Sequence, residues 1–186
     1  RTPGQSGTAV PAEAVTLAGE RVPVRTGERG VHAWTDDEDR AWLRGAHGSE
    51  GGRTREIGPP GERVMMPAIT ADARHVVMWS LERGVLLHRI TDGALVRVGD
   101  GGHPRVDPSG RWLVFERTED DGHDLTRSDL YLVDLRDPTY AVAPLLVTPD
   151  AIERMPSLSR IDERGEGMLA YLSDGALVVR PIRMTP

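Results

Sequence analysis

The stretch from His103 to Leu135, HPRVDPSGRWLVFERTEDDGHDLTRSDLYLVDL, decides the fold of this chain. Its apolar run at 112–115 and the alternating leucines at 130–135 are typical of β-strands. Pro108-Ser109-Gly110 forms a turn ahead of the first run, because proline presets its own φ and glycine tolerates a positive φ. The sequence therefore predicts a short lead-in strand, a tight turn and two longer strands.

The same unit recurs along the chain. PAITADARHVVMW begins at Pro67, MPSLSRIDERGEGMLAYL has its proline at 156, and a more divergent copy, HAWTDDEDRAWL, has His32 where the others have proline. The copies thus start near residues 32, 67, 104 and 156, and an insertion at 119–126 lengthens the third. Repeats of roughly this length are typical of architectures in which one supersecondary unit cannot bury its own apolar face.

These copies resemble the TolB-type β-propeller repeat, which covers residues 30 to 181. The third copy matches the pattern best, at Pro104, Asp107, Pro108, Gly110, Arg111 and the run from Tyr131 to Leu135. The other copies match at fewer positions, namely Trp34 and Thr35, Asp72 and Arg74, and Pro156 and Ser159. The resemblance implies an all-β propeller with one blade per copy. It implies much less about function, because unrelated activities share this fold.

The strands predicted for the copies differ at the two ends of the chain. We expect four strands in the second copy, at 68–71, 75–80, 85–90 and 94–99, and four in the third, at 104–107, 111–117, 129–135 and 143–148. In the first copy AWLRGAH is a clear strand, TREIG is interpreted as the outermost strand, and the third strand is uncertain. The fourth copy has no outer strand after ALVVRPI.

Arg21 to Thr26 could supply the missing strand beside Ala176 to Ile182. The prediction is therefore a four-bladed ring closed by an N-terminal strand that completes the last blade, which leaves no exposed sheet edge there. The alternative is a fragment of a six-bladed propeller, the blade number associated with the TolB family. Residues 1–14 are interpreted as a flexible leader, and residues 15–186 as a single propeller domain.

Composition excludes several classes of function. The net charge is −6, all 23 basic residues are arginines, and no basic cluster occurs, which argues against a nucleic-acid partner. The absence of cysteine excludes disulfides and cysteine-ligated metals, and no apolar stretch is long enough to span a membrane. The chain starts at Arg1 without an initiator methionine or signal peptide, which favours a mature form. The family resemblance implies a periplasmic or secreted location.

The candidate ligand-binding residues are His32, His103 and Arg105. Both histidines start a predicted innermost strand, which in a propeller lines the central channel, and imidazole binds metals and ligands readily. The alternative is that they only hydrogen-bond neighbouring loops. Calcium is a second possibility, at the acidic runs 36–39 and 119–124, although charged loops are usually just solvated. The metal content is left open.

Other polar and aromatic positions have structural interpretations. Thr35, Thr70, Asp107 and Ser159 occupy one column of the repeats, where a short oxygen-bearing side chain can bond the backbone of the following turn. The four tryptophans, at positions 34, 42, 79 and 112, are interpreted as packing between blades. Met65, Met66 and Met78 are interpreted as core residues. No motif of a nucleophile elbow, a zinc protease or a phosphate-binding glycine loop is present.

The sequence thus favours a monomeric, non-enzymatic interaction module without a cofactor, which binds a protein or a cell-envelope component through a propeller face. The alternative is a small-ligand or metal-binding propeller with its site in the axial channel, or the accessory propeller of a hydrolase.

Overall fold

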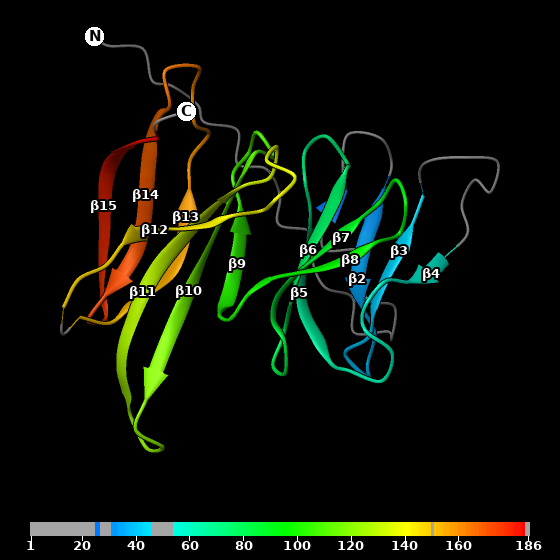
Figure 1. Ribbon diagram of the computed structural model, residues 1–186, viewed down its shortest axis with the longest axis horizontal. Coiled ribbons are helices and arrows are strands. Elements are labelled where there is room, and N and C mark those ends of the chain that lie inside the picture. Colours follow the sequence, from blue (N-terminus) through cyan, green and yellow to red (C-terminus); the bar gives the residue numbers. More distant parts are fainter. Residues whose placement is uncertain (1–24, 27–30, 46–53, 150, 185–186) are drawn as a thin grey trace, which may run out of the picture.

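The computed structural model describes residues 25–26, 31–45, 54–149 and 151–184. Within these ranges the chain forms four antiparallel β-sheets and no α-helix (Figure 1). This confirms the all-β class. The described ranges accordingly hold no helix of the length and apolarity needed to cross a membrane.

The sheets follow one another along the chain. The first contains β1 (Arg25–Thr26), β2 (His32–Thr35), β3 (Ala41–Arg44) and β4 (Thr54–Glu56). The second contains β5 (Val64–Ile69), β6 (His75–Ser80), β7 (Gly84–Arg89) and β8 (Leu95–Gly99). The third contains β9 (Gly102–Val106), β10 (Trp112–Asp120), β11 (Leu125–Asp134) and β12 (Val142–Leu146). The fourth contains β13 (Glu153–Leu158), β14 (Glu166–Ser173) and β15 (Ala176–Arg183).

The strands of the second and third copies lie within a few residues of their predicted positions. The main difference is the insertion at 119–126, which was expected to be a loop. β10 and β11 instead continue their pairing into it, with Thr118 opposite Ser128 and Glu119 opposite Arg127. The base of this hairpin is anchored by Ser128, which is buried and donates its hydroxyl to the Glu153 carbonyl at 2.6 Å, and by the ion pair of Arg127 with Asp129.

The predicted turn chemistry is confirmed in three copies. Asp107 accepts hydrogen bonds from the backbone N–H groups of Ser109, Arg111 and Trp112 at 2.8–3.0 Å. Thr70 and Ser159 accept from one backbone N–H each, those of His75 and Met168. In the first copy the residue after the predicted one, Asp36, takes this role for Glu38 and Arg40.

Three apolar clusters lie between successive sheets and form the core. The first joins the first and second sheets through residues such as Leu43 and Met78. The second joins the second and third through Val77, Leu87 and Phe115, and the third contains Trp112, Val114 and Leu169. Each sheet is therefore stabilised mainly by its neighbours, as expected for repeats that cannot bury their own faces.

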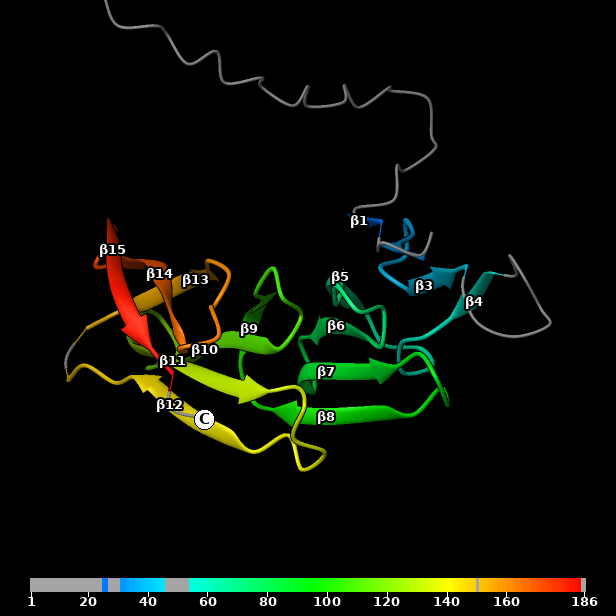
Figure 2. The same cartoon turned by 90° about the horizontal axis from the view of Figure 1, so that it is seen from above.

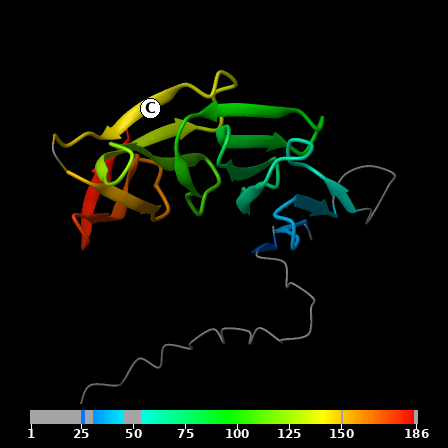
Figure 3. The ribbon, with the colours of Figure 1, turned by 90° about the horizontal axis from the view of Figure 1, so that it is seen from below.

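The predicted closure of the ring is wrong. Figures 2 and 3 show the sheets arranged as an open arc, with the first and fourth sheets at opposite ends. β1 pairs with β2 in the first sheet, Arg25 opposite Ala33 and Thr26 opposite His32, and not with β15. Folding back on a strand only a few residues ahead closes a far shorter loop than pairing with the other end of the chain, so it costs less entropy. Residues 21–24 and the predicted leader at 1–14 lie outside the described residues.

Candidate functional site

Because the strands of each sheet are antiparallel, their connections lie on two opposite faces of the arc. One face carries the hairpin loops between β6 and β7 and between β10 and β11, and we call it the hairpin face. The long β10–β11 hairpin projects from it (Figure 1). The other face carries the turns at 70–75 and 107–112, and we call it the turn face. The innermost strands β5, β9 and β13 all begin at the hairpin face.

A bulge marks the start of these three innermost strands. Met66, His103 and Met155 each precede a proline, and each has a positive φ, between 49° and 55°. At each site the innermost strand holds one residue more than the strand it pairs with. Such bulges change the direction of a side chain and often border functional sites. The sequence repeats therefore place a strained residue at the same point in three sheets.

A buried carboxylate anchors the bulge of the third sheet. Glu116 on β10 is 1% exposed, and its Oε1 atom lies 2.8 Å from Nδ1 of His103 and 3.3 Å from Nε of Arg154. Its Oε2 accepts the backbone N–H of Met155 at 2.6 Å. Because a buried carboxylate is costly unless it is paired, these contacts fix β9, β10 and β13 relative to one another. With Nδ1 donating to Glu116, Nε2 of His103 has no hydrogen-bond partner among the described residues.

A cavity of about 590 Å³ opens beside this carboxylate on the hairpin face. Trp79 forms one wall, its ring centroid 4.8 Å from that of His103. A Cβ atom at Gly102 would lie 2.9 Å from the Trp79 ring, so only glycine allows this close approach. The remaining walls come from the β6–β7 loop, the link at 100–101, strand β10, one residue of β11 and one of β13. Their lining residues are Leu81, Glu82, Gly84, Asp100, Gly101, Glu116, Arg117, Thr118, Glu119, Leu125 and Arg154. We call this cavity the hairpin-face pocket.

The structure does not bring the three predicted ligand-binding residues into one pocket. His103 lines the hairpin-face pocket. Arg105, two residues further along β9, lines a separate cavity of about 380 Å³ with Asp107 and Ser157. His32 lies on β2 in the first sheet, and its buried Nδ1 has no hydrogen-bond partner in the part of the chain that the structure describes.

Sequence reasoning missed Trp79, Glu116 and Arg154 as site residues. Glu116 could have been suspected, because it continues the alternation of Trp112 and Val114, whose side chains pack toward the fourth sheet. A carboxylate in phase with a buried apolar face needs partners. Arg154 gave no such signal, since its approach to Glu116 depends on the packing of two sheets.

In each acidic run considered for calcium, a carboxylate already accepts hydrogen bonds from its own loop. Asp36 accepts hydrogen bonds from Arg40 and from Nε1 of Trp42. Asp121 accepts the backbone N–H groups of Asp124 and His123, which lower the pKa of its carboxyl. Across the described ranges, no group of three or more His, Asp or Glu side chains is arranged to hold a metal ion.

No protein-family model and no curated protein sequence matches this chain. Solved structures do match its backbone. A prolyl endopeptidase superposes with a TM-score of 0.55 at 12% identity, over 89% of this chain and 29% of that protein. The tricorn protease superposes with a TM-score of 0.56 at 10% identity, over 77% of this chain and 14% of the protease. An oligogalacturonate lyase from Vibrio parahaemolyticus gives a TM-score of 0.52 at 11% identity, over 83% of this chain and 50% of the lyase.

These three proteins are of the β-propeller type. The successive antiparallel sheets of the present chain have the same arrangement. The fold is of the β-propeller type. The chain spans half or less of the length of each of these proteins. At such low identity the likeness shows the fold alone, and membership of the TolB-type repeats stays a prediction.

Proposed function

We propose that this propeller is a non-enzymatic interaction module that binds a segment of a protein partner in the hairpin-face pocket. The observation that carries the proposal is the assembly of Trp79, His103, Glu116 and Arg154 from three neighbouring sheets around one open cavity. A preformed concave site with an aromatic wall and a few fixed polar groups is typical of binding.

The charges at the mouth favour a basic partner segment. Arg154 is engaged with Glu116, and Arg117 donates to the Asp100 carbonyl and lies 4.2 Å from the Tyr131 ring centroid. In contrast, neither Glu82 nor Glu119 has an ion-pair contact within the described residues, although Glu119 lies opposite Arg127 in the β10–β11 ladder. An arginine or lysine of the partner can therefore lie against Trp79 and meet these two carboxylates.

We also propose that binding, and not catalysis, is the function of this pocket. Glu116 already accepts from three donors, so its oxygens are held for structure and it is a poor candidate for a general base. The resemblance to TolB-type repeats supports a periplasmic or secreted location, where a cell-envelope protein would be the partner.

A pull-down from envelope extract tests this proposal. We expect the immobilised wild-type chain to retain a partner that is lost with Trp79→Ala and with the double charge reversal Glu82→Arg and Glu119→Arg. Glu163→Arg, at an exposed position on the turn face, is the matched control and should retain it. A partner bound equally by all four proteins would contradict the proposal, provided that circular dichroism shows each variant to be folded.

Small-ligand binding in the same pocket is the second candidate. The cavity volume of about 590 Å³ lies within the range of small-molecule sites, and no described residue hydrogen-bonds Nε2 of His103. A thermal-shift screen would reveal it as stabilisation that Trp79→Ala abolishes. The role of accessory propeller to a hydrolase takes its motivation from the prolyl endopeptidase and the tricorn protease.

A further inference from the structure

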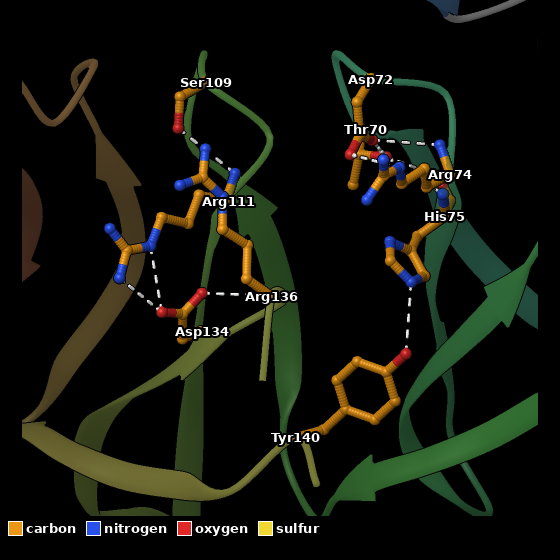
Figure 4. Close-up of polar contacts among 9 residues, drawn as sticks. All are labelled: Thr70, Asp72, Arg74, His75, Ser109, Arg111, Asp134, Arg136 and Tyr140. Carbon is orange, nitrogen blue, oxygen red and sulfur yellow. Dashed lines mark hydrogen bonds and ion pairs between the residues drawn. The ribbon is translucent and has the colours of Figure 1, made fainter. Parts of the chain in front are cut away.

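A third cavity lies on the turn face, between the second and third sheets. Its volume is about 550 Å³. Figure 4 shows Asp72, Arg74 and His75 of the second sheet across from Ser109 and Arg136 of the third, whereas the Arg111 guanidinium points away from them toward Asp134. Gly110 and Leu135 complete the lining. This cavity is on the face of the arc opposite the hairpin-face pocket, and we call it the turn-face cavity.

Arg111 lines this cavity, but its guanidinium is held beside Asp134, away from the second sheet. Its Nε and Nη2 atoms donate to Oδ2 of Asp134 at 3.0 and 2.6 Å, and its guanidinium lies 4.4 Å from the ring centroid of Trp112. Burial alone would raise the pKa of Asp134, but the bonds from Arg111 and from the backbone of Arg136 outweigh it and lower that pKa. Asp134 is therefore ionised and fixes the plane of the Arg111 guanidinium on the side of the third sheet that faces the fourth, so Arg111 shapes the edge of the cavity and does not offer donors to it.

Two further guanidinium groups at the cavity are only weakly engaged. Arg74 is 73% exposed, and its one ion-pair contact, to Asp72, is long at 3.6 Å. Asp72 is itself occupied by the Thr70 hydroxyl and the Arg74 backbone. The side chain of Arg136 makes no ion pair within the described residues, although its backbone N–H donates to Asp134 at 3.0 Å.

His75 forms the inner wall and has an unsatisfied atom. It is 8% exposed, its Nε2 lies 3.3 Å from the Tyr140 hydroxyl, and its buried Nδ1 has no hydrogen-bond partner among the described residues. Leaving such a buried polar atom unpaired destabilises the fold. The wall is also stiff, because a Cβ atom at Gly110, whose φ is +77°, would lie 2.7 Å from the Ala71 backbone nitrogen. The turns of the two sheets thus touch directly.

We propose that the turn-face cavity binds a phosphoryl group, either as inorganic phosphate or on a small phosphorylated molecule. Two guanidinium groups, those of Arg74 and Arg136, face one carboxylate, Asp72, that already has partners, so the cavity is locally positive in a protein of net charge −6. Planar guanidinium donors fit the oxygens of a tetrahedral dianion, and the Ser109 hydroxyl adds a neutral donor. This site is independent of the hairpin-face pocket.

Isothermal titration calorimetry at low, constant ionic strength tests the proposal. The full chain is titrated with inorganic phosphate, sulfate, glycerol phosphate and acetate. We expect phosphate and sulfate to bind and acetate, which offers a single planar charge, to bind at least tenfold more weakly. Tighter binding of glycerol phosphate than of phosphate would assign the site to a phosphorylated small molecule, and the reverse order would assign it to the free ion.

Variants at the exposed arginines locate the binding. The double variant Arg74→Gln and Arg136→Gln should weaken phosphate binding at least tenfold, while Arg164→Gln, at an exposed position of the fourth sheet, should leave it unchanged. Neither arginine of the double variant has a close ion pair, so the fold should persist, and a thermal melt checks this. Absence of phosphate binding at millimolar concentration, equal binding of acetate, or an equal loss with Arg164→Gln would overturn the proposal.

Discussion

Glu116 joins two sheets through a single buried carboxylate. Its partners come from the backbone and side chains of β9 and β13, so its removal leaves the Met155 N–H and the Arg154 guanidinium without their acceptor. Breaking one side of a buried charged network typically costs about 3–5 kcal/mol. We therefore expect Glu116→Ala to lower the free energy of unfolding by about this amount in urea denaturation.

Glu116→Gln should cost less than Glu116→Ala, because its amide oxygen can still accept the Met155 N–H. Glu119→Ala, three residues along the same strand but exposed, should change little. Equal effects of Glu116→Ala and Glu119→Ala would show that the carboxylate does not hold the sheets together.

Trp112 fills the interface between the third and fourth sheets. It is 6% exposed and belongs to the same cluster as Leu158, Leu169 and Tyr171. Truncation of a buried aromatic typically costs about 3–5 kcal/mol. Trp112→Ala should therefore be among the most destabilising substitutions in a denaturant series, whereas Trp34→Ala, at a half-buried position of the first sheet, should cost less. The reverse order would mean that the core is misplaced.

His88 makes the stability of the fold depend on pH. It is 4% exposed, neither ring nitrogen has a partner within the described ranges, and burial, with the nearby charge of Arg55, lowers its pKa from 6.5 to about 4. Between these values the unfolded chain binds a proton that the folded chain does not, so stability falls as the pH falls from 7 to 4. The loss is on the order of 3 kcal/mol for this residue.

His88→Leu should reduce this dependence, while the pKa of the buried His75, which burial also lowers, leaves a remainder. The measurement is the difference in unfolding free energy between pH 7.5 and pH 4.5 for the wild type and the variant. His123→Gln, in the exposed β10–β11 loop, is the control and should leave the difference unchanged. An undiminished difference in His88→Leu would contradict the assignment.

Single residues were predictable where the repeat pattern itself specified them. The turn oxygens of Thr70 and Asp107 and the glycine at 110 have the roles that their spacing indicated. The separation of His103 from Arg105 was not predictable, because strand alternation places residues two apart on one face, and a bulge at His103 changes that relation.

The bulges are the repeated feature at the scale of the strand. The proline that follows Met66, His103 and Met155 was visible in the sequence, but the positive φ before it depends on the register with the second strand of each sheet. Similarly, the repeat showed that residues 119–126 were inserted, yet their pairing as a hairpin depends on cross-strand contacts that no single strand reveals.

The strain at a bulge can be measured at Met155, which has a φ of 51° and is half exposed. A β-branched residue is strongly disfavoured at such a φ, whereas glycine adopts it freely. We expect Met155→Val to destabilise the chain by about 1–2 kcal/mol relative to Met155→Gly, measured by chemical denaturation. The same pair of substitutions at Met168, a strand residue of the same sheet, should give the opposite order. A more stable valine variant at 155 would contradict the bulge.

At the scale of the whole molecule, four sheets and three apolar interfaces form an open arc (Figure 2). The repeats predicted the sheets, their order and the three strands of the last sheet, because each is specified locally. The ring closure could not be derived from the same pattern. It would pair segments at opposite ends of the chain, and a matching count of strands does not show which partner an N-terminal strand prefers.

The fourth sheet ends the arc with apolar side chains in solvent. Met155, Met168, Leu177 and Val179 are all exposed there. The predicted monomer and the alternative of a larger, six-bladed propeller stay predictions. Sedimentation velocity at several concentrations distinguishes a monomer from molecules that associate through this face.

Paired cysteines test the central claim, that the N-terminal strand belongs to the first sheet and the arc is open. The chain has no cysteine, so no native thiol competes with the two introduced ones, and dilution suppresses disulfides between molecules. Thr26 lies opposite His32 in the β1–β2 ladder. Paired residues of antiparallel strands are about 4.5–5.5 Å apart at Cα, a distance that a disulfide spans. In dilute solution under mild oxidation, the account predicts an intramolecular disulfide in Thr26→Cys/His32→Cys and none in Thr26→Cys/Val179→Cys, as read by mass spectrometry of unreduced digests. A disulfide within one chain in the second variant and none in the first would contradict it.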